Sequence, residues 1–499
     1  MRTALGLLGA ILFVSASPST ALAYDCGYHW DLTRDALAQA GFGPDAVAVV
    51  EVENFYADGF SSATQVIDNR WVRALSLDDD WGALFGPAEM RLLSDESFHF
   101  SGLENSAEVE DRWDQLVRGT YHAAKTAERE GDARGLLSVL GTSLHAVQDF
   151  YAHSNWAALE SRGLGPALVP DPTWFDLPRA ARARADVYTS RPGADPAKDH
   201  PGEDDVFVRC YRQAFYASRQ WAELVRSWLD EDFWGRAARL SAPEIWRERE
   251  LVRSLALYSG HWKGPSSERI AGLAVVGGLY TRRADRAAIG RWARYARLAA
   301  TGSAEAPDAV PVPVVPDSLP PVPRQTWVAV RVEEVKETDR DKVFDVDPFG
   351  RADFYAEVTV NGRVYTEAVH FGSDHVTTEA WLTLAPLLPG TSQVSLSVAI
   401  RDQDTVLGSA WPRGGGGDDL CDINPEPGYR TWTAELSLAD LAAAGSPAGG
   451  LGVSTDGWRA APGDGAEAAA KFVIELLESG RDLGPRPGVK DQEVSARDR

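Results

Sequence analysis

Residues 141–156 have the sequence GTSLHAVQDFYAHSNW, in which His145, Asp149 and His153 follow one another at intervals of four residues. On an α-helix each such step turns by only about 40° and rises by about 6 Å, so the three side chains share one face. Imidazole and carboxylate groups are ordinary zinc ligands, and the aromatic residues beside them would keep water away. The stretch therefore predicts a metal site on a helix rather than three polar residues on a solvated face.

The chain around this motif, from residue 24 to about residue 300, is expected to be helical. Apolar residues recur there with helical periodicity, glycine is sparse, and Ala, Leu, Arg and Glu, which favour helices, are frequent. Pro, Gly and Asp interrupt the pattern over residues 160–205, which we expect to form an ordered loop. The best-defined helical segments are residues 109–130, 135–159, 206–229 and 243–257.

A proline-rich segment follows the helical region. Seven prolines lie between Pro307 and Pro323. Such a segment favours an extended, stiff conformation, so residues 301–325 are predicted to be a linker that holds two bodies apart.

From Thr326 the apolar pattern alternates with a period of two, which is typical of half-buried strands. The dipeptide Asn361-Gly362 is a hairpin turn signal. We therefore expect residues 326–445 to form an antiparallel β-sandwich. The predicted fold class is multidomain, with an all-α metal-binding domain followed by this sandwich.

The two ends of the chain have distinct compositions. Residues 1–23 combine a basic start, a short apolar run and an Ala-Leu-Ala exit, as secretory signal peptides do, so we expect a secreted protein. The run is too short to span a bilayer. Residues 446–499 are predicted to be a tail with one helix near residues 467–478 and a disordered end.

Charge and cysteine content narrow the possible functions. The formal net charge is −23, which disfavours long-range attraction to nucleic acid and suits a protein that collects cations. Three cysteines are too few for a disulfide scaffold. We predict at most one disulfide, between Cys26 and Cys210, with two unrelated buried thiols as the alternative.

The motif Leu-His145-x-x-x-Asp149-Phe-Tyr-Ala-His153-Ser-Asn-Trp resembles the zinc-dependent phospholipase C and single-strand nuclease superfamily, in particular its heterokaryon-incompatibility-type branch. The resemblance covers roughly residues 24–260 and implies an all-helical phosphodiesterase with a three-zinc cluster. In that superfamily the mature N-terminal residue binds zinc, and a fixed order of His and Asp ligands follows. The residues at the corresponding places are Tyr24, His29, Asp58, His99, His145, Asp149, His153, His200 and Asp204.

The resemblance also implies a mechanism in which zinc-bound hydroxide attacks phosphorus. Asp58 would then be both a metal ligand and the catalytic group that accepts the proton of the water. Its distance from His99 in the sequence is longer than in the superfamily, so Asp78, Asp79 and Asp80 are rivals. His153 also follows Asp149 more closely than usual.

The predicted sandwich has acidic clusters of its own. Carboxylates on adjacent loops suit calcium, which takes six or more oxygen ligands, although aspartate is also common in turns. The sequence around these clusters is similar to that of C2 domains, which bind calcium and often membranes. The predicted calcium ligands are Asp345, Asp347, Asp353, Asp402, Asp404, Asp419 and Asp422.

Three functions remain open at this point. The first is a secreted zinc-dependent phosphodiesterase, phospholipase C-like, which would act on a phosphate-ester substrate and use the C2-like module at a phospholipid surface. The second is a nuclease of the same superfamily, which the charge disfavours. The third is a non-catalytic secreted interaction protein that keeps metals for structure.

Overall fold

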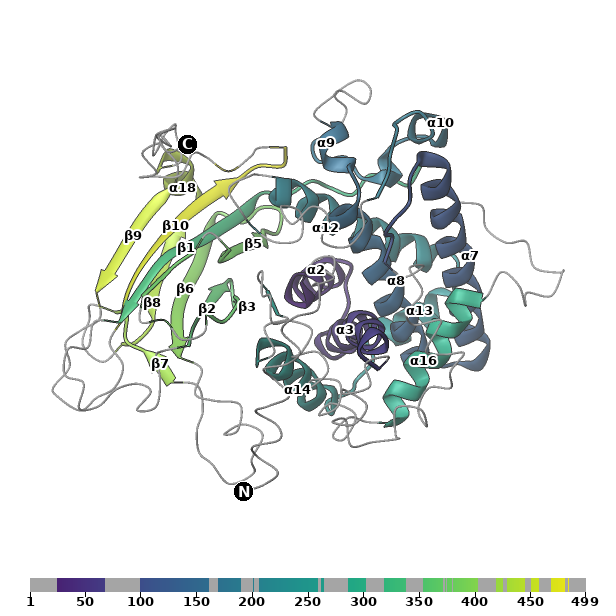
Figure 1. The fold of residues 1–499 in the computed structure, drawn as a ribbon, viewed down its shortest axis with the longest axis horizontal. Helices are drawn as coiled ribbons and strands as arrows, with labels where there is room; N and C mark the ends of the chain where they lie inside the picture. Colours follow the sequence, from purple (N-terminus) through teal and green to yellow (C-terminus); the bar gives the residue numbers. More distant parts are fainter. Residues whose placement is uncertain are drawn as a thin grey trace, which may run out of the picture. The chain divides into compact units, whose positions relative to one another are not determined.

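The computed structural model of the chain consists of two compact units, residues 1–324 and residues 325–499. Helices make up the first unit and antiparallel sheets the second (Figure 1), which confirms the predicted order of a helical region and then β-structure. The structure describes residues 25–67, 99–160, 169–189, 201, 206–258, 262–263, 286–301, 318–337, 353–370, 373, 375–378, 380–402, 419–424, 429–444, 450–456, 468–480 and 483.

Helix α8 is the centre of the helical unit. It contacts helices on several sides, and every residue from Gly135 to His153 is buried. The side chain of Asp132 caps its first turn by accepting a hydrogen bond from the Gly135 N–H. The helices of this unit are α2 (Cys26–Gln39), α3 (Pro44–Ile67), α7 (Ser106–Glu130), α8 (Ala133–His153), α9 (Trp156–Glu160), α10 (Arg179–Arg182), α12 (Val206–Ser227), α13 (Glu231–Ala238), α14 (Ile245–Tyr258) and α16 (Arg286–Thr301), with the 3-10 turn η2 (Trp174–Asp176).

Close approach of α3 to α8 depends on a glycine. A Cβ atom at Gly141 would lie 2.7 Å from the Cβ of Glu53 and 2.9 Å from the backbone nitrogen of Asn54. Only a residue without a side chain fits there, because such distances are far below normal contact. Gly141 is one turn before His145, so this contact brings α3 directly beside the metal-site motif.

The second unit is a sandwich of two antiparallel sheets. One has the order β4-β1-β10-β9 with β5 also paired to β1, and the other has the order β3-β2-β6-β7 with β8 also paired to β6. A short helix, α18 (Leu438–Ala444), follows β8. The strands are β1 (Trp327–Glu337), β2 (Phe354–Val360), β3 (Arg363–Thr366), β4 (His375–Thr377), β5 (Leu382–Pro386), β6 (Gln393–Asp402), β7 (Asp419–Cys421), β8 (Trp432–Ser437), β9 (Leu451–Asp456) and β10 (Ala468–Leu477).

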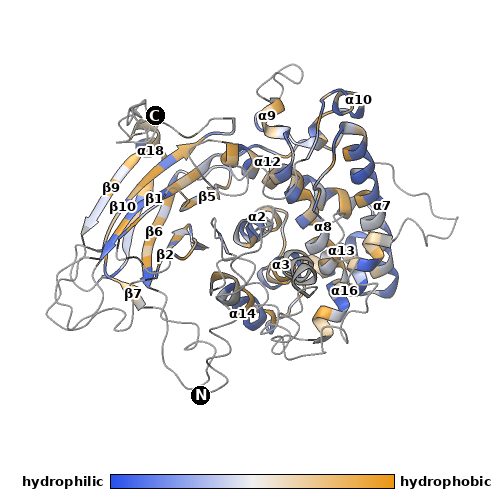
Figure 2. Cartoon of the chain, in the orientation of Figure 1, coloured by the Kyte–Doolittle hydropathy of each residue, from blue (hydrophilic) through white to orange (hydrophobic). Residues whose placement is uncertain are grey.

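Alternate residues of the strands fill the sandwich core. On β6, Leu396, Val398 and Ile400 are buried in it, and on β10 Phe472 and Ile474 are buried in it. Figure 2 shows the hydrophobic colour recurring along these strands. The core is therefore apolar and comes from both sheets, as expected for this architecture.

The hairpin between β2 and β3 has the predicted turn. Asn361 and Gly362 have φ angles of 48° and 79°, and Val360 faces Arg363 across the ladder. Two consecutive left-handed residues characterise the type I′ turn, which asparagine and glycine tolerate well.

One prediction about a domain end is wrong. Residues 468–477 form strand β10 between β1 and β9, not a helix in a tail, so the sandwich extends well past residue 445. The end of the predicted linker also packs on the helical unit, because Leu319 donates its N–H to the carbonyl of Phe175. Arg324 likewise donates to the Pro170 carbonyl and pairs with Asp176.

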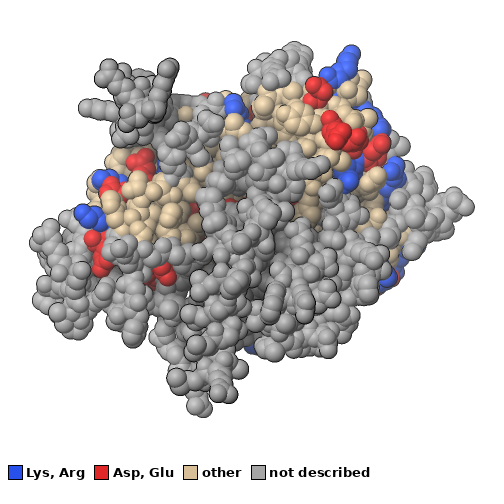
Figure 3. All heavy atoms as spheres, viewed as in Figure 1, with Lys and Arg blue, Asp and Glu red and all other residues tan. Residues whose placement is uncertain are grey.

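Charges of both signs lie close together on the described surface that Figure 3 shows. On α7 and α10, for example, Arg179 pairs with Asp114 at 2.8 Å. Among the described residues no helix is long and apolar enough to cross a membrane.

Candidate metal centre

Two side chains of the motif on α8 point into one polar cluster. His145 and Asp149 are both fully buried, and the Nε2 atom of His145 lies 3.4 Å from Oδ2 of Asp149. The spacing of one helical turn accounts for this contact. Helix α8 thus supplies an imidazole and a carboxylate at the same place.

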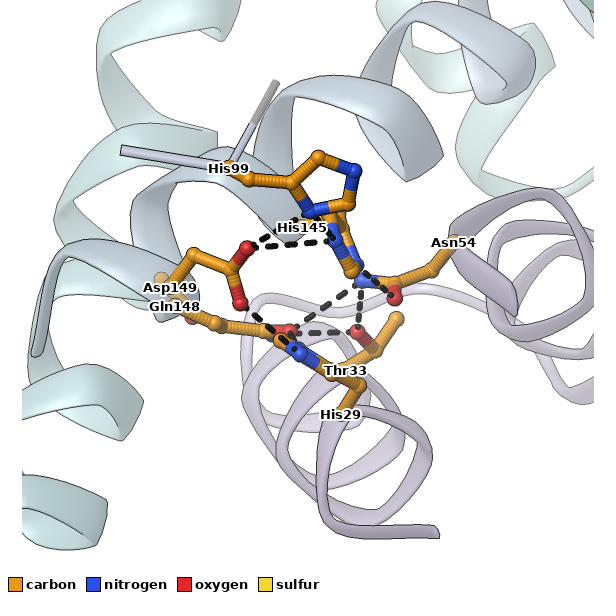
Figure 4. A network of polar contacts seen from close by, with 8 residues as sticks. His29, Thr33, Asn54, His99, His145, Gln148 and Asp149 are labelled. Carbon is orange, nitrogen blue, oxygen red and sulfur yellow. Dashed lines mark hydrogen bonds and ion pairs between the residues drawn. The ribbon is translucent and has the colours of Figure 1, made fainter. Parts of the chain in front are cut away.

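Two further histidines reach this carboxylate from other parts of the chain. His29 of α2 places its Nε2 atom 3.1 Å from Oδ1 of Asp149. His99 places its Nδ1 atom 3.0 Å from Oδ2 of Asp149 and 3.2 Å from Nε2 of His145. The side chain of Asp149 therefore lies among three imidazoles (Figure 4).

The cluster fits a metal ion by its donor set. Among the described residues, His29, His145 and Asp149 each offer a ligand atom, and these atoms all lie within 4.8 Å of one another. Zinc bonds of about 2.0–2.1 Å in a tetrahedron place neighbouring ligand atoms roughly 3.3 Å apart. His29 lies 3.1 Å from Oδ1 of Asp149, whereas His99 and His145 lie 3.0 Å and 3.4 Å from Oδ2, so the two carboxylate oxygens face different imidazoles.

A second layer of polar groups surrounds these candidate ligands. The Nδ1 atom of His29 lies 2.8 Å from Oε1 of Gln148, and Nδ1 of His145 lies 3.2 Å from Oδ1 of Asn54. Both amides also reach the hydroxyl of Thr33 on α2, at 3.1 Å each. The sequence did not indicate Asn54 and Gln148, because amides are not zinc ligands and the two residues belong to no recognised motif.

Electrostatics in the cluster follow from burial and from the opposite charges. Burial alone would raise the pKa of Asp149, but His145, His29 and His99 hold it well below its usual range. The carboxylate is therefore ionised, as a metal ligand must be.

His153 lies one turn beyond Asp149 on α8 and is only 2% exposed. Burial lowers the pKa of His153 to about 4, so its imidazole is neutral at physiological pH. It does not belong to the trio whose ligand atoms converge, so its predicted role as a ligand stays a prediction.

A dry wall of aromatic side chains backs the cluster. The ring of Phe150, next to Asp149, contacts Trp113 and Trp174 with ring centroids 5.2 Å away in each case. Phe100 packs on the same group, 4.7 Å from Trp113, with a left-handed backbone φ of 41° that a bulky residue seldom adopts. This packing holds the turn that carries His99.

Several predicted zinc ligands lie outside the described residues. Asp58 has its backbone in α3, one turn after Asn54, but its side chain is not described. Neither the backbone nor the side chain is described for Tyr24, His200, Asp204 and the rivals Asp78, Asp79 and Asp80. The cluster thus contains His29, His99, His145 and Asp149 from the predicted set.

The predicted calcium ligands are described only in part. Asp402 at the end of β6 accepts the backbone N–H of Asp353 at 2.6 Å, and the β7 register places Asp419 opposite Asp402. Burial raises the pKa of Asp422 just beyond β7. Asp345, Asp347 and Asp404 lie outside the described residues. Three of the predicted acidic positions thus meet at one end of one sheet.

The predicted disulfide is wrong. Cys26 on α2 and Cys210 on α12 are both buried, and neither is joined in a disulfide in the structure. The two helices nevertheless pack together.

Fold and cluster together define a class: a two-unit protein whose helical unit encloses a buried His/Asp centre suited to a divalent metal ion. Comparison with protein families adds a match of residues 88–183 to the model of the VWA7 N-terminal domain. This match includes His99, His145 and Asp149 but covers less than half of the chain. The superfamily that the motif resembles stays a prediction.

Solved structures similar to the chain match about a third of it at low identity. Human GIVD cytosolic phospholipase A2 in complex with methyl gamma-linolenyl fluorophosphonate is 14% identical, with 32% of this chain and 18% of that chain covered and a TM-score of 0.20. The first C2 domain of plant Extended Synaptotagmin 1 is 10% identical over 32% of this chain and 98% of that chain, with a TM-score of 0.20. The chain therefore spans under a fifth of the phospholipase. No curated protein matches it.

Proposed function

We propose that the helical unit binds zinc through His29, His145 and Asp149, with His99 as a further ligand. The observation that carries this proposal is the convergence of one ligand atom from each of the first three residues within 4.8 Å. Three imidazoles around one ionised carboxylate match zinc better than calcium or magnesium, which prefer oxygen ligands.

We further propose that the protein is a secreted phosphoric ester hydrolase, phospholipase C-like. A bound zinc ion would supply a water with a pKa near neutrality and an electrophile for a phosphoryl oxygen. Asp149 neutralises part of the positive charge of the zinc ion, and the histidines hold the ion in place. The rings of Phe150 and Trp113 exclude water behind the site. Asp58 is the proposed proton acceptor.

Metal binding is tested first, by zinc content after purification and dialysis. Wild type is expected to retain zinc, whereas His145→Ala and Asp149→Ala lose most of it. His122→Ala, on α7 outside the cluster, is the matched control and should retain the wild-type content. Equal zinc in all four proteins would contradict the proposed site.

Hydrolysis is tested next on the zinc-loaded full chain. We expect turnover of a phosphocholine ester and little cleavage of single-stranded DNA, because the net charge of −23 repels a polyanion. Preferred cleavage of DNA would instead favour the nuclease of the same superfamily.

A second candidate function is a non-catalytic, metal-stabilised secreted interaction protein. The burial of the cluster favours it, since His29, His145 and Asp149 are at most 1% exposed within the described structure. A fully loaded protein that melts at a higher temperature with zinc but hydrolyses neither substrate would select this function over the first.

For the sandwich we propose a C2-like module that binds calcium at the end of β6 and assists contact with phospholipid. The support is the grouping of Asp353, Asp402 and Asp419 at neighbouring strand ends. Calcium should slow amide exchange of β6 and promote binding to anionic vesicles, and Asp402→Asn should reduce both effects. Unchanged exchange with calcium would contradict the proposal.

A further inference from the structure

We infer that Asn54 and Gln148 are positioning residues that fix the tautomers of His145 and His29 and thereby aim both Nε2 atoms at Asp149. The inference rests on the proposed zinc site. A neutral imidazole carries its proton on one nitrogen only, and the other nitrogen alone can bind a metal. Something in the protein must therefore decide which nitrogen is which.

The orientation of the Asn54 amide follows from its donors. Its Nδ2 atom lies 3.1 Å from the Thr33 hydroxyl oxygen and 3.1 Å from Oε1 of Gln148. The remaining atom, Oδ1, then faces Nδ1 of His145 at 3.2 Å. A flipped amide would set its NH₂ group against that imidazole and its oxygen against the Gln148 oxygen.

The Gln148 amide is fixed in the same way. Its Nε2 atom donates to Thr33 at 3.1 Å and to Ser218 at 3.3 Å, and the Ser218 hydroxyl itself donates to the Ala214 carbonyl at 2.8 Å. Its Oε1 atom therefore accepts from both Asn54 and His29. The two amides thus lock each other, with helices α2 and α12 as anchors.

Amide oxygens only accept hydrogen bonds, so the nitrogen facing each of them must carry the proton. His29 and His145 consequently hold their protons on Nδ1. That leaves Nε2 as the nitrogen that faces the oxygens of Asp149, at 3.1 Å for His29 and 3.4 Å for His145. Metal-bound histidines in proteins commonly donate their other ring N–H to such an acceptor, which fixes ring orientation.

The amides are buried and uncharged, which distinguishes them from a carboxylate in the same position. Asn54 and Gln148 are fully buried, and they orient the imidazoles without adding a second negative charge beside Asp149. In the zinc-free protein the Nε2 atoms are already directed at the place where the ion would bind.

The first test uses nitrogen-15-labelled histidine in the zinc-free full chain. Long-range nitrogen–proton correlation spectra distinguish the two tautomers. We expect Nδ1 of both His29 and His145 to carry a proton in wild type, and Nδ1 of His145 to lose this proton in Asn54→Leu. A wild-type His145 in the Nε2–H form would overturn the inference.

The second test measures zinc affinity in matched variants. Asn54→Leu and Gln148→Met remove the acceptors at similar volume, and each should weaken zinc binding about 10–100-fold. Asn54→Asp and Gln148→Glu keep an acceptor oxygen at the imidazole and should bind zinc more tightly than Asn54→Leu and Gln148→Met. Thr142→Val removes a buried hydroxyl that donates to the Ser138 carbonyl within α8, and should leave the affinity unchanged.

The outcomes separate this inference from the proposed function. If wild type shows no zinc binding that depends on Asp149, the zinc proposal fails, while the tautomer spectra still decide the role of the amides. If zinc binds but Asn54→Leu and Thr142→Val weaken it equally, the positioning role fails. If Asn54→Leu does not fold, the wild-type spectrum and Asn54→Asp decide.

Discussion

The helical unit buries a polar cluster within its apolar core, whereas the core cluster of the sandwich is apolar. In the helical unit a carboxylate, three imidazoles and two amides lie together in one cluster. Helices α2, α3 and α8 and the turn at His99 contribute these groups. In the sandwich the interior is a cluster of aliphatic and aromatic residues, such as Ile400 and Phe472, from both sheets. Both interiors exclude water, but they are stabilised by different means.

The difference has an energetic consequence. Apolar burial stabilises in proportion to area and tolerates changes of shape. Buried polar groups stabilise only as a complete set, because one missing partner leaves another group unsatisfied. The helical unit should therefore respond abruptly to single polar changes and the sandwich gradually to apolar ones.

Removing the carboxylate at the centre of the cluster should have the largest effect. Asp149→Ala takes away the group that three histidines share, and we expect a loss of about 3–5 kcal/mol in unfolding free energy, together with the zinc. Hydrogen exchange should rise in α8 and stay unchanged in β6. Asp114→Ala, in a partly exposed pair with Arg179, should cost less than about 1 kcal/mol. Equal effects of the two variants would remove the contrast.

The matching change in the sandwich is the loss of an aliphatic side chain on β10. Ile474 is fully buried in the core, so Ile474→Ala should cost about 2–5 kcal/mol without any change in zinc content. Lys471 on the same strand is exposed, and Lys471→Ala should cost less than about 1 kcal/mol. Urea unfolding measures both losses of unfolding free energy. Similar losses at the two positions would contradict the placing of Ile474 on the buried face of β10 and of Lys471 on its exposed face.

A single methyl group between α3 and α8 gives a sharper test. Gly141→Ala places a Cβ atom 2.7 Å from Glu53, so α3 must move away, at a cost of about 1–3 kcal/mol and with weaker zinc binding. Gly290→Ala on α16 has nothing within 4 Å of the new atom. It should be neutral or stabilising, because alanine favours helix. If both variants lose stability, the cause is the change of glycine to alanine within a helix and not the contact between α3 and α8.

Per pH unit, the smallest expected effect is the dependence of stability on pH that Glu53 contributes. Burial raises the pKa of Glu53 to about 8, well above its ordinary value of 4.5. The folded state therefore keeps a proton that the unfolded chain loses, and stability decreases as pH rises from about 4.5 to about 8, by at most about 1.4 kcal/mol per pH unit. Glu53→Gln should abolish this slope in urea unfolding at pH 6, 7 and 8. Glu244→Gln, an exposed control, should keep it.

The centre of the candidate metal site could be predicted because helical periodicity fixes neighbours one turn apart. His145 and Asp149 needed nothing more than their spacing. His29 and His99 lie far from them in the chain and were suggested only by the order of ligands in the superfamily. The amides of Asn54 and Gln148 could not be predicted, although Asn54 is one turn before the proposed Asp58 on α3.

The tail shows where local signals mislead. Residues 466–478 are rich in Ala, Glu and Leu, which favour helix, yet residues 468–477 form a strand. Pairing to β1 and β9 on both sides, with Phe472 and Ile474 directed into the core, outweighs propensity. The acidic loops were harder still, because loop positions follow no period.

The hydrogen bond between His29 and Gln148 joins residues 119 positions apart. Ribosomes add about 5–20 residues per second, so α2 waits roughly ten seconds for its partner helix to be made. During that time the histidine and Thr33 face water. The centre is thus a late product of synthesis, and α8 supplies the last of its described candidate ligands.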